Sequence, residues 1–405
     1  MLDIEKIRKD FPILASEVNG RPLVYFDNSA TSQKPQVVID ALMEFYSRHN
    51  SNIHRGVHHL SELVSGEYEG SRSKVCDFIN ADKPDEVVFT NSTTGSINLL
   101  ADSLSKSYLS KGDEIIVTEM EHHSNLVPWQ MACERSGAIL RMLPVEDDGS
   151  LSIGLLDEII CERTKVLAVS HVSNVLGIVN PVNEICELAR DNDVTSVVDA
   201  AQSIPHLGID VQKMGCDFLA FSGHKVLAES GIGVLYGKEE SLRDLPPSQG
   251  GGGMVAKVSM KGTTYADPPL RFEAGTPNIS GALSLAVALD YMQNVGMREM
   301  IEHEDVLTSY MLNRLKEVEG LSLYGTAGPR VPLFSFNIDG IHHYDIGLVL
   351  DKMGVAVRTG THCAEPLMER YGVSGTVRAS LAFYNTIDEI DIFFEALEKS
   401  VRLLG

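Results

Sequence analysis

Short apolar runs that end in polar turns alternate with amphipathic stretches through residues 86–237. The apolar runs have the length and the β-branched content of buried strands. A helical stretch precedes them at 35–48, where a proline opens a segment with apolar residues at 38, 39, 42, 45 and 46. Repeated alternation of strand and helix predicts an α/β fold with a doubly wound, largely parallel sheet and right-handed crossovers. The predicted strands are 86–90, 114–118, 165–177, 194–198, 218–222 and 231–237.

The pattern changes near the C-terminal third of the chain. A well-patterned helix at 279–295 is followed by a charged helix, by the strands LFSFNIDG and GVAVRTG, and by a final amphipathic helix at 387–403. This order predicts a smaller α+β domain packed on the first. We therefore expect an N-terminal segment (1–20) that packs with the small domain, a large domain (21–290) and a small C-terminal domain (291–405).

Two of the predicted strands end in residues of opposite charge, a lysine and an aspartate. DFLAFSGHK presents Lys225 on a turn, and VTSVVDAAQ ends in Asp199 followed by Gln202. Parallel neighbours would bring both groups to the carboxyl edge where open α/β sheets bind ligands. Pyridoxal phosphate chemistry needs an amine for the aldehyde and a carboxylate for the pyridine nitrogen. The alternative is a solvated lysine and a turn-forming aspartate, which are common after strands.

Hydroxyl and imidazole groups near the same edge could hold a phosphate. Ser222 and His224 flank the glycine of the lysine turn and can donate hydrogen bonds to an anion. Thr93 and Thr94 lie between a strand and a helix that is expected to begin near Ser96, where free N–H groups favour anions. Ordinary N-capping is the alternative, and it would explain only one of these hydroxyl residues.

Other polar groups follow further strands or occupy loops. His122 and His123 follow the strand at 114–118, where an imidazole could stack on a flat ring and relay protons, or could be an ordinary surface residue. The strand predicted at 165–177 presents Asn174 near its end. The loop at 50–61 contains His54 and Arg55, and is either a solvated surface or the rim of a substrate site.

The loop RTGTHCAEP is the second informative segment. Cys363 follows His362 in a turn bounded by glycine and proline, near Arg358, and such electropositive surroundings favour a reactive thiolate. The alternative is a small buried hydrophobic residue, which is what the patterns around the other five cysteines predict. Arg378 lies in the apolar stretch TVRASLAFYN and needs an anion, for which a substrate carboxylate is a good candidate.

Composition narrows the class of protein. The 405 residues carry a formal charge of -22, which argues against non-specific nucleic-acid binding. The N-terminal pattern lacks a signal peptide, and no apolar run has the length of a membrane span. The six cysteines have neither CxxC nor zinc spacing, so we expect a reduced, cytoplasmic setting without a metal site or disulfides.

The motifs, taken in order, resemble one family over almost the whole chain. The chain is similar to the group II (SUF-type) cysteine desulfurases, pyridoxal phosphate enzymes of fold-type I in the class V aminotransferase superfamily, a branch that also includes the selenocysteine lyases. The short cysteine loop favours this branch. The motifs are YFDNSATSQKP, NIHRGVH, EHHSNLVPWQ, HVSNVLG, VVDAAQS, SGHK, QGGGGM, FEAGTPN, RTGTHCAEPL and VRASLAFYNT.

The resemblance implies roles for individual residues. Lys225 would bind the cofactor aldehyde, Asp199 its pyridine nitrogen and Gln202 its phenolic oxygen, while His123 would stack on its ring. The implied phosphate ligands are Thr94, Ser222 and His224, with Thr276 from the other subunit of a homodimer, and we expect Thr93 and Asn174 to bind the cofactor as well. The implied substrate groups are Asn174 and Arg378, and we also expect His54, Arg55 and Arg358 to bind the substrate.

The family's reaction converts L-cysteine to L-alanine and leaves a persulfide, here on Cys363, for an acceptor or scaffold protein of iron–sulfur cluster assembly. A selenocysteine lyase and a non-catalytic scaffold homologue are the alternatives. Two departures from the family pattern stand beside the expected site. Val226 to Ser230 replace a different segment after the lysine, and Thr361 stands where a histidine is more usual.

Overall fold

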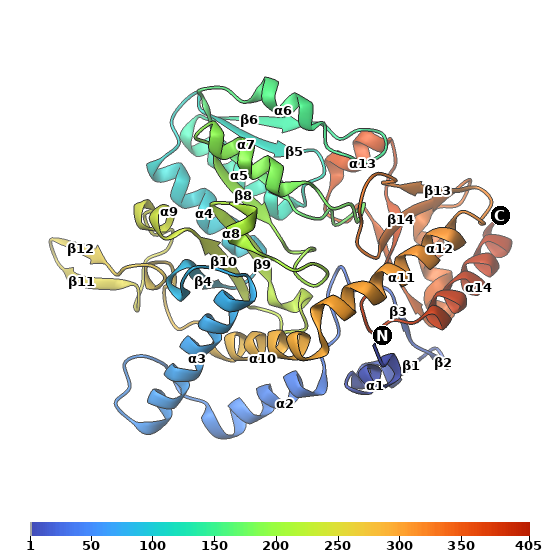
Figure 1. The fold of residues 1–405 in the computed structure, drawn as a ribbon, viewed down its shortest axis with the longest axis horizontal. Coiled ribbons are helices and arrows are strands. Elements are labelled where there is room, and N and C mark those ends of the chain that lie inside the picture. The colour runs from blue at the N-terminus through green and yellow to red at the C-terminus, as the bar shows by residue number, and fades with distance from the viewer. Residues whose placement is uncertain (1) are drawn as a thin grey trace.

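The computed structural model describes residues 2–405, and a seven-stranded sheet forms the centre of its larger part (Figure 1). Strands β5 to β9 pair with one another in parallel, whereas β10 runs antiparallel to both of its neighbours, β9 and β4. The prediction of an α/β fold with a mostly parallel doubly wound sheet is thus confirmed. In spatial order the strands are β4 (Val87–Thr90), β10 (Gly233–Gly237), β9 (Phe218–Ser222), β8 (Thr195–Asp199), β7 (Thr164–Ser170), β5 (Glu114–Thr118) and β6 (Ile139–Leu143).

Helices cover both faces of this sheet, because successive side chains of each buried strand point to opposite sides. Ile115 and Val117 of β5 pack with Leu100 and Trp129 from α4 and α5, whereas Ile116 joins the core formed with α3, α7 and α10. The helices of this part are α2 (Gln36–Glu44), α3 (His59–Phe78), α4 (Thr93–Ser107), α5 (Val127–Ser136), α6 (Ile153–Ile159), α7 (Val182–Asp191), α8 (Val211–Met214), α9 (Glu239–Asp244) and α10 (Ile279–Val295).

The C-terminal part is an antiparallel sheet with helices packed on it. Its strand order is β13 (Leu321–Tyr324), β14 (Leu333–Ile338), β17 (Thr376–Ser380) and β16 (Arg358–Gly360). Apolar side chains of α11, α12 and α14 share one core with β14 and β17, and these helices lie together in Figure 1. The helices are α11 (Met297–Leu315), α12 (His343–Lys352), α13 (Glu365–Tyr371) and α14 (Ile387–Leu404).

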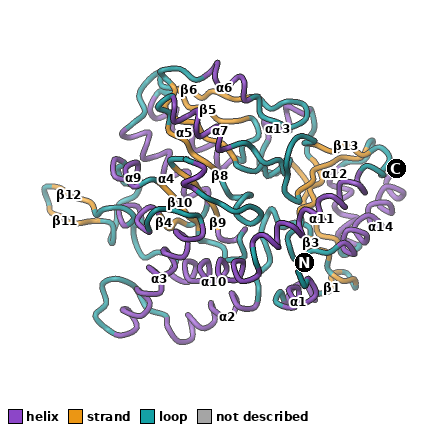
Figure 2. Tube along the Cα trace, in the orientation of Figure 1, coloured by secondary structure: helices purple, strands orange, loops and turns teal. Residues whose placement is uncertain are grey.

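The N-terminal segment lies beside the C-terminal part (Figure 2). Strand β3 (Val24–Tyr25) pairs in parallel with β15 (Val355–Ala356), and Val24 and Phe26 are buried in the C-terminal core. The pairing therefore extends beyond residue 20, where we placed a boundary, and the three-part division stays a prediction. The remaining elements are α1 (Ile4–Lys9) and the hairpins β1 (Glu17–Val18) with β2 (Arg21–Pro22) and β11 (Val255–Ser259) with β12 (Gly262–Tyr265).

No helix within residues 2–405 is long and apolar enough to cross a membrane.

A buried ion pair fixes the loop after β12 to the large sheet. The guanidinium of Arg72 on α3 makes two hydrogen bonds to Glu273, of 2.7 and 3.0 Å, and Glu273 also accepts the backbone N–H of Phe89 on β4 at 2.8 Å. Both charged side chains are almost fully buried. Glu273 therefore ties residues 272–278 to two elements that are far away in the sequence.

Replacing Glu273 by alanine should lower the free energy of unfolding by about 3 kcal/mol, because it leaves a buried guanidinium without its main partner. Chemical denaturation of the purified protein measures this change. The control is Glu302→Ala on α11, which removes an exposed ion pair with Arg298 and should leave the unfolding midpoint unchanged. Equal midpoints for both variants would contradict the structural importance of the buried pair.

Candidate active site

The carboxyl ends of β4, β5, β7, β8 and β9 meet at one edge of the sheet, and a cavity of about 280 Å³ lies there. Residues of the C-terminal part close its other side. The cavity is thus formed where open parallel sheets usually bind ligands. Its lining includes Thr93, Thr94, His122, Asn174, Asp199, Gln202, Ser222, His224, Lys225, Arg358, His362, Cys363 and Arg378.

Lys225 ends a single 3-10 turn, Gly223–Lys225, directly after β9. The turn is tight: a Cβ on Gly223 would come within 2.5 Å of the Ile232 side chain. Burial is the main influence on the amine and lowers the pKa of Lys225 to about 8, while the charge of Asp199 opposes that shift. A larger share of the amine is therefore neutral, and nucleophilic, near neutral pH than for an exposed lysine.

Asp199 ends β8 and lines the same cavity with only 5% of its surface exposed. Burial raises the pKa of this carboxyl, while the backbone N–H of Ala201, which donates to Oδ1 at 2.9 Å, acts in the opposite direction. A buried carboxylate of this kind favours a cationic partner in the cavity. Gln202, three residues further, donates from its side-chain amide to the backbone oxygen of Ser29 at 2.9 Å.

Hydroxyl groups gather where α4 begins. The Ser222 hydroxyl lies 2.7 Å from the hydroxyl of Thr93 and accepts the Thr93 backbone N–H at 2.8 Å. The helix approaches β10 so closely that a Cβ on Gly233 would lie 2.5 Å from the backbone of Ser92. The start of α4 at Thr93, earlier than the predicted Ser96, therefore directs its first N–H groups toward the lysine turn, as an anion site requires.

Two arginines of the C-terminal part share one carboxylate. Arg358 binds Asp27 with donor–acceptor distances of 3.1 Å, and Arg378 Nη2 lies 3.5 Å from the same side chain. Arg378 also donates from Nη1 to the backbone oxygen of Asn174 at 2.8 Å, but its Nε is buried without a partner. Burial lowers the pKa of Arg378 to about 10. An unpaired donor at the cavity wall fits an anionic ligand group.

Cys363 lies at the mouth of the cavity in an unusual backbone conformation. His362 and Cys363 both have positive φ angles, 55° and 56°, which are uncommon for residues other than glycine. The side-chain amide of Asn174 donates to the His362 backbone oxygen at 2.8 Å, and the backbone N–H of His123 donates to that of Cys363 at 2.9 Å. These contacts hold an exposed thiol beside the lysine and the arginines. Of the other cysteines, Cys133 and Cys161 are only partly buried.

Four predicted site residues do not line this cavity. His123 contacts Glu365 instead, and its neighbour His122 lines the cavity. Burial lowers the pKa of His122 to about 3, so its ring is neutral at ordinary pH. Exposed His54 lies 2.9 Å from Glu69 on α3, while Arg55 is exposed on the same loop. Their predicted roles stay predictions.

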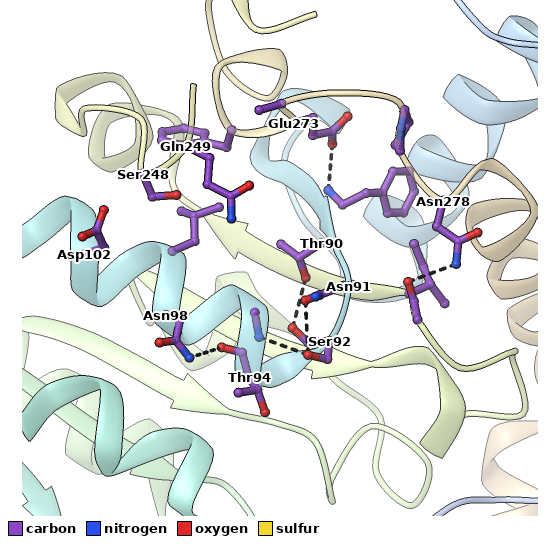
Figure 3. A pocket seen from close by; sticks show the side chains of 18 of the residues that line it. Thr90, Asn91, Ser92, Thr94, Asn98, Asp102, Ser248, Gln249, Glu273 and Asn278 are labelled. Carbon is purple, nitrogen blue, oxygen red and sulfur yellow. Dashed lines mark hydrogen bonds between the residues drawn. The ribbon is translucent and has the colours of Figure 1, made fainter. Parts of the chain in front are cut away.

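The fourth residue, Thr276, lines a second and larger cavity of about 710 Å³ (Figure 3). Its walls come from the start of α4 and from the loops around residues 248–249 and 272–278. Ser92 and Thr94 line both cavities, so the second cavity lies beside the residues that are predicted to bind the phosphate. Asn98 donates to the backbone oxygen of Thr94 at 2.8 Å and supports this wall.

Sequence reasoning missed three groups that the structure places at the site. Asp27, which orients both arginines, follows a short strand, and this position was a usable signal. Lys34 donates to the backbone oxygen of His224 at 3.1 Å, and burial lowers its pKa to about 8. Glu365 contacts His123. Within residues 2–405 no group of three or more His, Cys, Asp or Glu side chains could hold a metal ion.

A nucleophilic lysine and a buried carboxylate on one cavity, with an anion cradle beside them, define a pyridoxal phosphate enzyme of fold-type I. The model of the family described as aminotransferase class-V matches residues 24–393, and the chain belongs to that family. The predicted resemblance is thereby confirmed at the level of this family, whereas the SUF-type subdivision stays a prediction.

Relatives that match the full length of the chain are all named as cysteine desulfurases or probable cysteine desulfurases in the examples that follow. A probable cysteine desulfurase from Halalkalibacterium halodurans is 48% identical over 404 residues, which cover 100% of this chain and 99% of the relative. A cysteine desulfurase from Pectobacterium carotovorum is 49% identical over 403 residues and 99% of each chain. The solved apo structure of a cysteine desulfurase from Thermococcus onnurineus has a TM-score of 0.94 and 40% identity, covering 100% of this chain and 99% of that one.

The lowered pKa of Lys225 predicts how the apoprotein takes up pyridoxal phosphate. The uptake rate should rise with pH and level off above about pH 8, because only the neutral amine attacks the aldehyde. Stopped-flow absorbance after mixing apoprotein with the cofactor measures this profile, with Lys225→Ala as the control that develops no bound-cofactor band. A rate that continues to rise to about pH 10.4, the value of a free lysine, would contradict the effect of burial.

Proposed function

We propose that the protein is a pyridoxal phosphate-dependent cysteine desulfurase that converts L-cysteine to L-alanine and leaves the sulfur on Cys363. The observation that carries the proposal is the shared cavity: Lys225, Asp199 and Arg378 line it together with Cys363, which is the one exposed cysteine within residues 2–405. The names of the full-length relatives support the same reaction.

The residues present fit the cofactor. The buried Asp199 carboxylate is available to the pyridine nitrogen, the start of α4 with Thr93, Ser222 and His224 to the phosphate, and Lys225 to the aldehyde. When bound, pyridoxal phosphate supplies an electron sink for the bonds broken at the substrate. Asp199 maintains that property because a carboxylate beside the ring nitrogen favours its protonated form.

Side chains of the protein bind the substrate and remove a proton from it. Arg378 binds the cysteine carboxylate, using the Nε donor that has no protein partner, while Asp27 and Asn174 hold the guanidinium in place. The amine of Lys225 removes the proton from the substrate α-carbon.

Cys363 then accepts the sulfur. Its thiolate attacks the substrate sulfur, an S–S bond forms, and the Cβ–S bond breaks. The electron pair of that bond stays with the substrate carbon, which takes up a proton and becomes the methyl group of alanine, while the α-carbon regains the proton that Lys225 removed. The product on the enzyme is a persulfide, which a sulfur-acceptor or cluster-scaffold protein consumes.

The proposal includes a homodimer in the cytoplasm. Thr276 and Thr94 both line the larger cavity. A second copy of the chain that docks there would bring its own 272–278 loop toward the residues of this copy that are proposed to bind the phosphate. In the proposed dimer, His54 and Arg55, which are exposed here, would contact the substrate bound by the partner subunit. In this arrangement each cavity is completed by two subunits.

Replacing Cys363 by alanine should abolish sulfide release from L-cysteine and leave the visible absorbance of the bound cofactor unchanged, because Cys363 accepts sulfur but does not hold the cofactor. A sulfide assay under reducing conditions and an absorption spectrum measure the two properties. Cys133→Ala, at a partly buried thiol on α5, is the matched control and should keep full activity. Turnover by the Cys363 variant would refute its acceptor role.

Replacing Arg378 by lysine should raise KM for L-cysteine about 100-fold with a smaller change in kcat, since the single ammonium of lysine cannot contact Asp27 and the Asn174 backbone and also present a fixed donor to the substrate carboxylate. Steady-state kinetics of alanine formation provide the measurement. Arg370→Lys, a variant of an arginine that contacts Asp147 and Val145 away from the cavity, is the control. An unchanged KM in Arg378→Lys would place the substrate carboxylate elsewhere.

A further inference from the structure

A side-chain cluster at the mouth of the cavity connects the cysteine loop to the histidine turn after β5. The Glu365 carboxylate, two residues after Cys363, contacts Nε2 of His123 through one oxygen. Its other oxygen accepts the hydroxyl of Thr361 at 2.9 Å. The backbone N–H of His123 donates to the backbone oxygen of Cys363 at 2.9 Å, so the two segments are joined by side chains and by backbone.

We propose that Glu365 is a positioning residue for His123: its carboxylate accepts the Nε2 proton and holds the imidazole beside Cys363, which leaves Nδ1 as the nitrogen that exchanges protons during sulfur transfer. The inference rests on the proposed desulfurase function. It gives a role to Glu365, for which the sequence patterns predicted none.

The geometry distinguishes this contact from an ordinary surface ion pair. The side chains of His123 and Glu365 are 36% and 52% exposed, and a pair this open usually contributes little by itself. Here, however, the Glu365 carboxylate is already oriented by the Thr361 hydroxyl, and the backbone of His123 is fixed to the Cys363 loop. Less side-chain freedom of Glu365 is therefore lost when the pair forms.

The proposed hydrogen bond is compatible with a role at the cofactor. An imidazole N–H lies in the plane of its ring, so a carboxylate that accepts the Nε2 proton would lie at the edge of the ring and leave both faces free to stack. A histidine that donates from Nε2 in its neutral form accepts or donates its second proton at Nδ1.

The surrounding charges agree with a carboxylate that stays ionised. Burial raises the pKa of the Glu365 carboxyl, but the Thr361 hydrogen bond and the His123 contact outweigh it, and the pKa is lowered overall.

The kinetic test compares Glu365→Ala with Glu365→Gln and with Glu369→Ala, an exposed glutamate one turn further along α13. We expect Glu365→Ala to lower kcat for alanine formation about tenfold with little change in KM, a loss of the size seen when a group that orients a reacting imidazole is removed. Glu365→Gln, whose amide oxygen can still accept the Nε2 proton, should recover most of the rate. Thr361→Val should have a smaller effect in the same direction, and Glu369→Ala none.

A double-mutant cycle with His123→Ala decides whether Glu365 acts through His123. We expect Glu365→Ala to have no further effect on kcat when His123 is absent. Additive losses, an unchanged kcat in Glu365→Ala, or faster turnover in both Glu365 variants would overturn the proposal.

A second readout uses the apoprotein and does not depend on activity. In ¹⁵N-histidine spectra the Nε2–H signal of His123, assigned by its loss in His123→Ala, should be protected from solvent exchange in the wild type and in Glu365→Gln but not in Glu365→Ala. Fast exchange in the wild type would overturn the contact itself. Protection together with a lack of sulfur release from L-cysteine would instead reject the proposed function and leave the contact standing.

Discussion

The withdrawal of the Lys225 amine from solvent, opposite the buried carboxylate of Asp199, is the constraint on which the site depends. Removing both groups from water costs free energy, and the fold can offset that cost only because β8 and β9 are parallel neighbours that end at the same edge. The rigid sheet fixes their separation. The cavity between them is therefore prepared for a ligand that carries both an electrophilic carbon and a basic nitrogen.

In the proposed reaction, the C-terminal part contributes the groups that recognise and attack the substrate. Its antiparallel sheet carries Arg358 and Arg378, and Asp27, which follows a strand paired to that same part, binds both. The loop of Cys363 projects from the end of β16 toward the strand ends of the large sheet. Since the proposed cofactor groups and the proposed sulfur acceptor, Cys363, belong to different sheets, the packing between these sheets would control the distance over which sulfur moves.

Much of this arrangement could be predicted from the sequence, because buried parallel strands are apolar runs and their polar end residues stand out. Lys225 and Asp199 were found in this way, and Arg378 was found as a charge within an apolar stretch. Strand β6 was missed, since at an edge of the sheet it is mostly exposed and includes Arg141. The contacts of Asp27 and Glu365 could not be predicted, because Arg358 lies 331 positions from Asp27 and His123 lies in a turn after a distant strand. Pairings over such distances follow from the packing of the two sheets rather than from any local pattern.

The most direct test of the central claim is to identify the lysine that binds the cofactor. The holoenzyme is treated with borohydride, which makes the bond between lysine and cofactor permanent, and the digested protein is analysed by mass spectrometry. The account predicts the cofactor-derived mass on Lys225 alone. Lys34 is a demanding internal comparison, because burial lowers its pKa to about 8 as well and it contacts the same turn. Labelling of Lys34, of any other lysine, or of none would contradict the account.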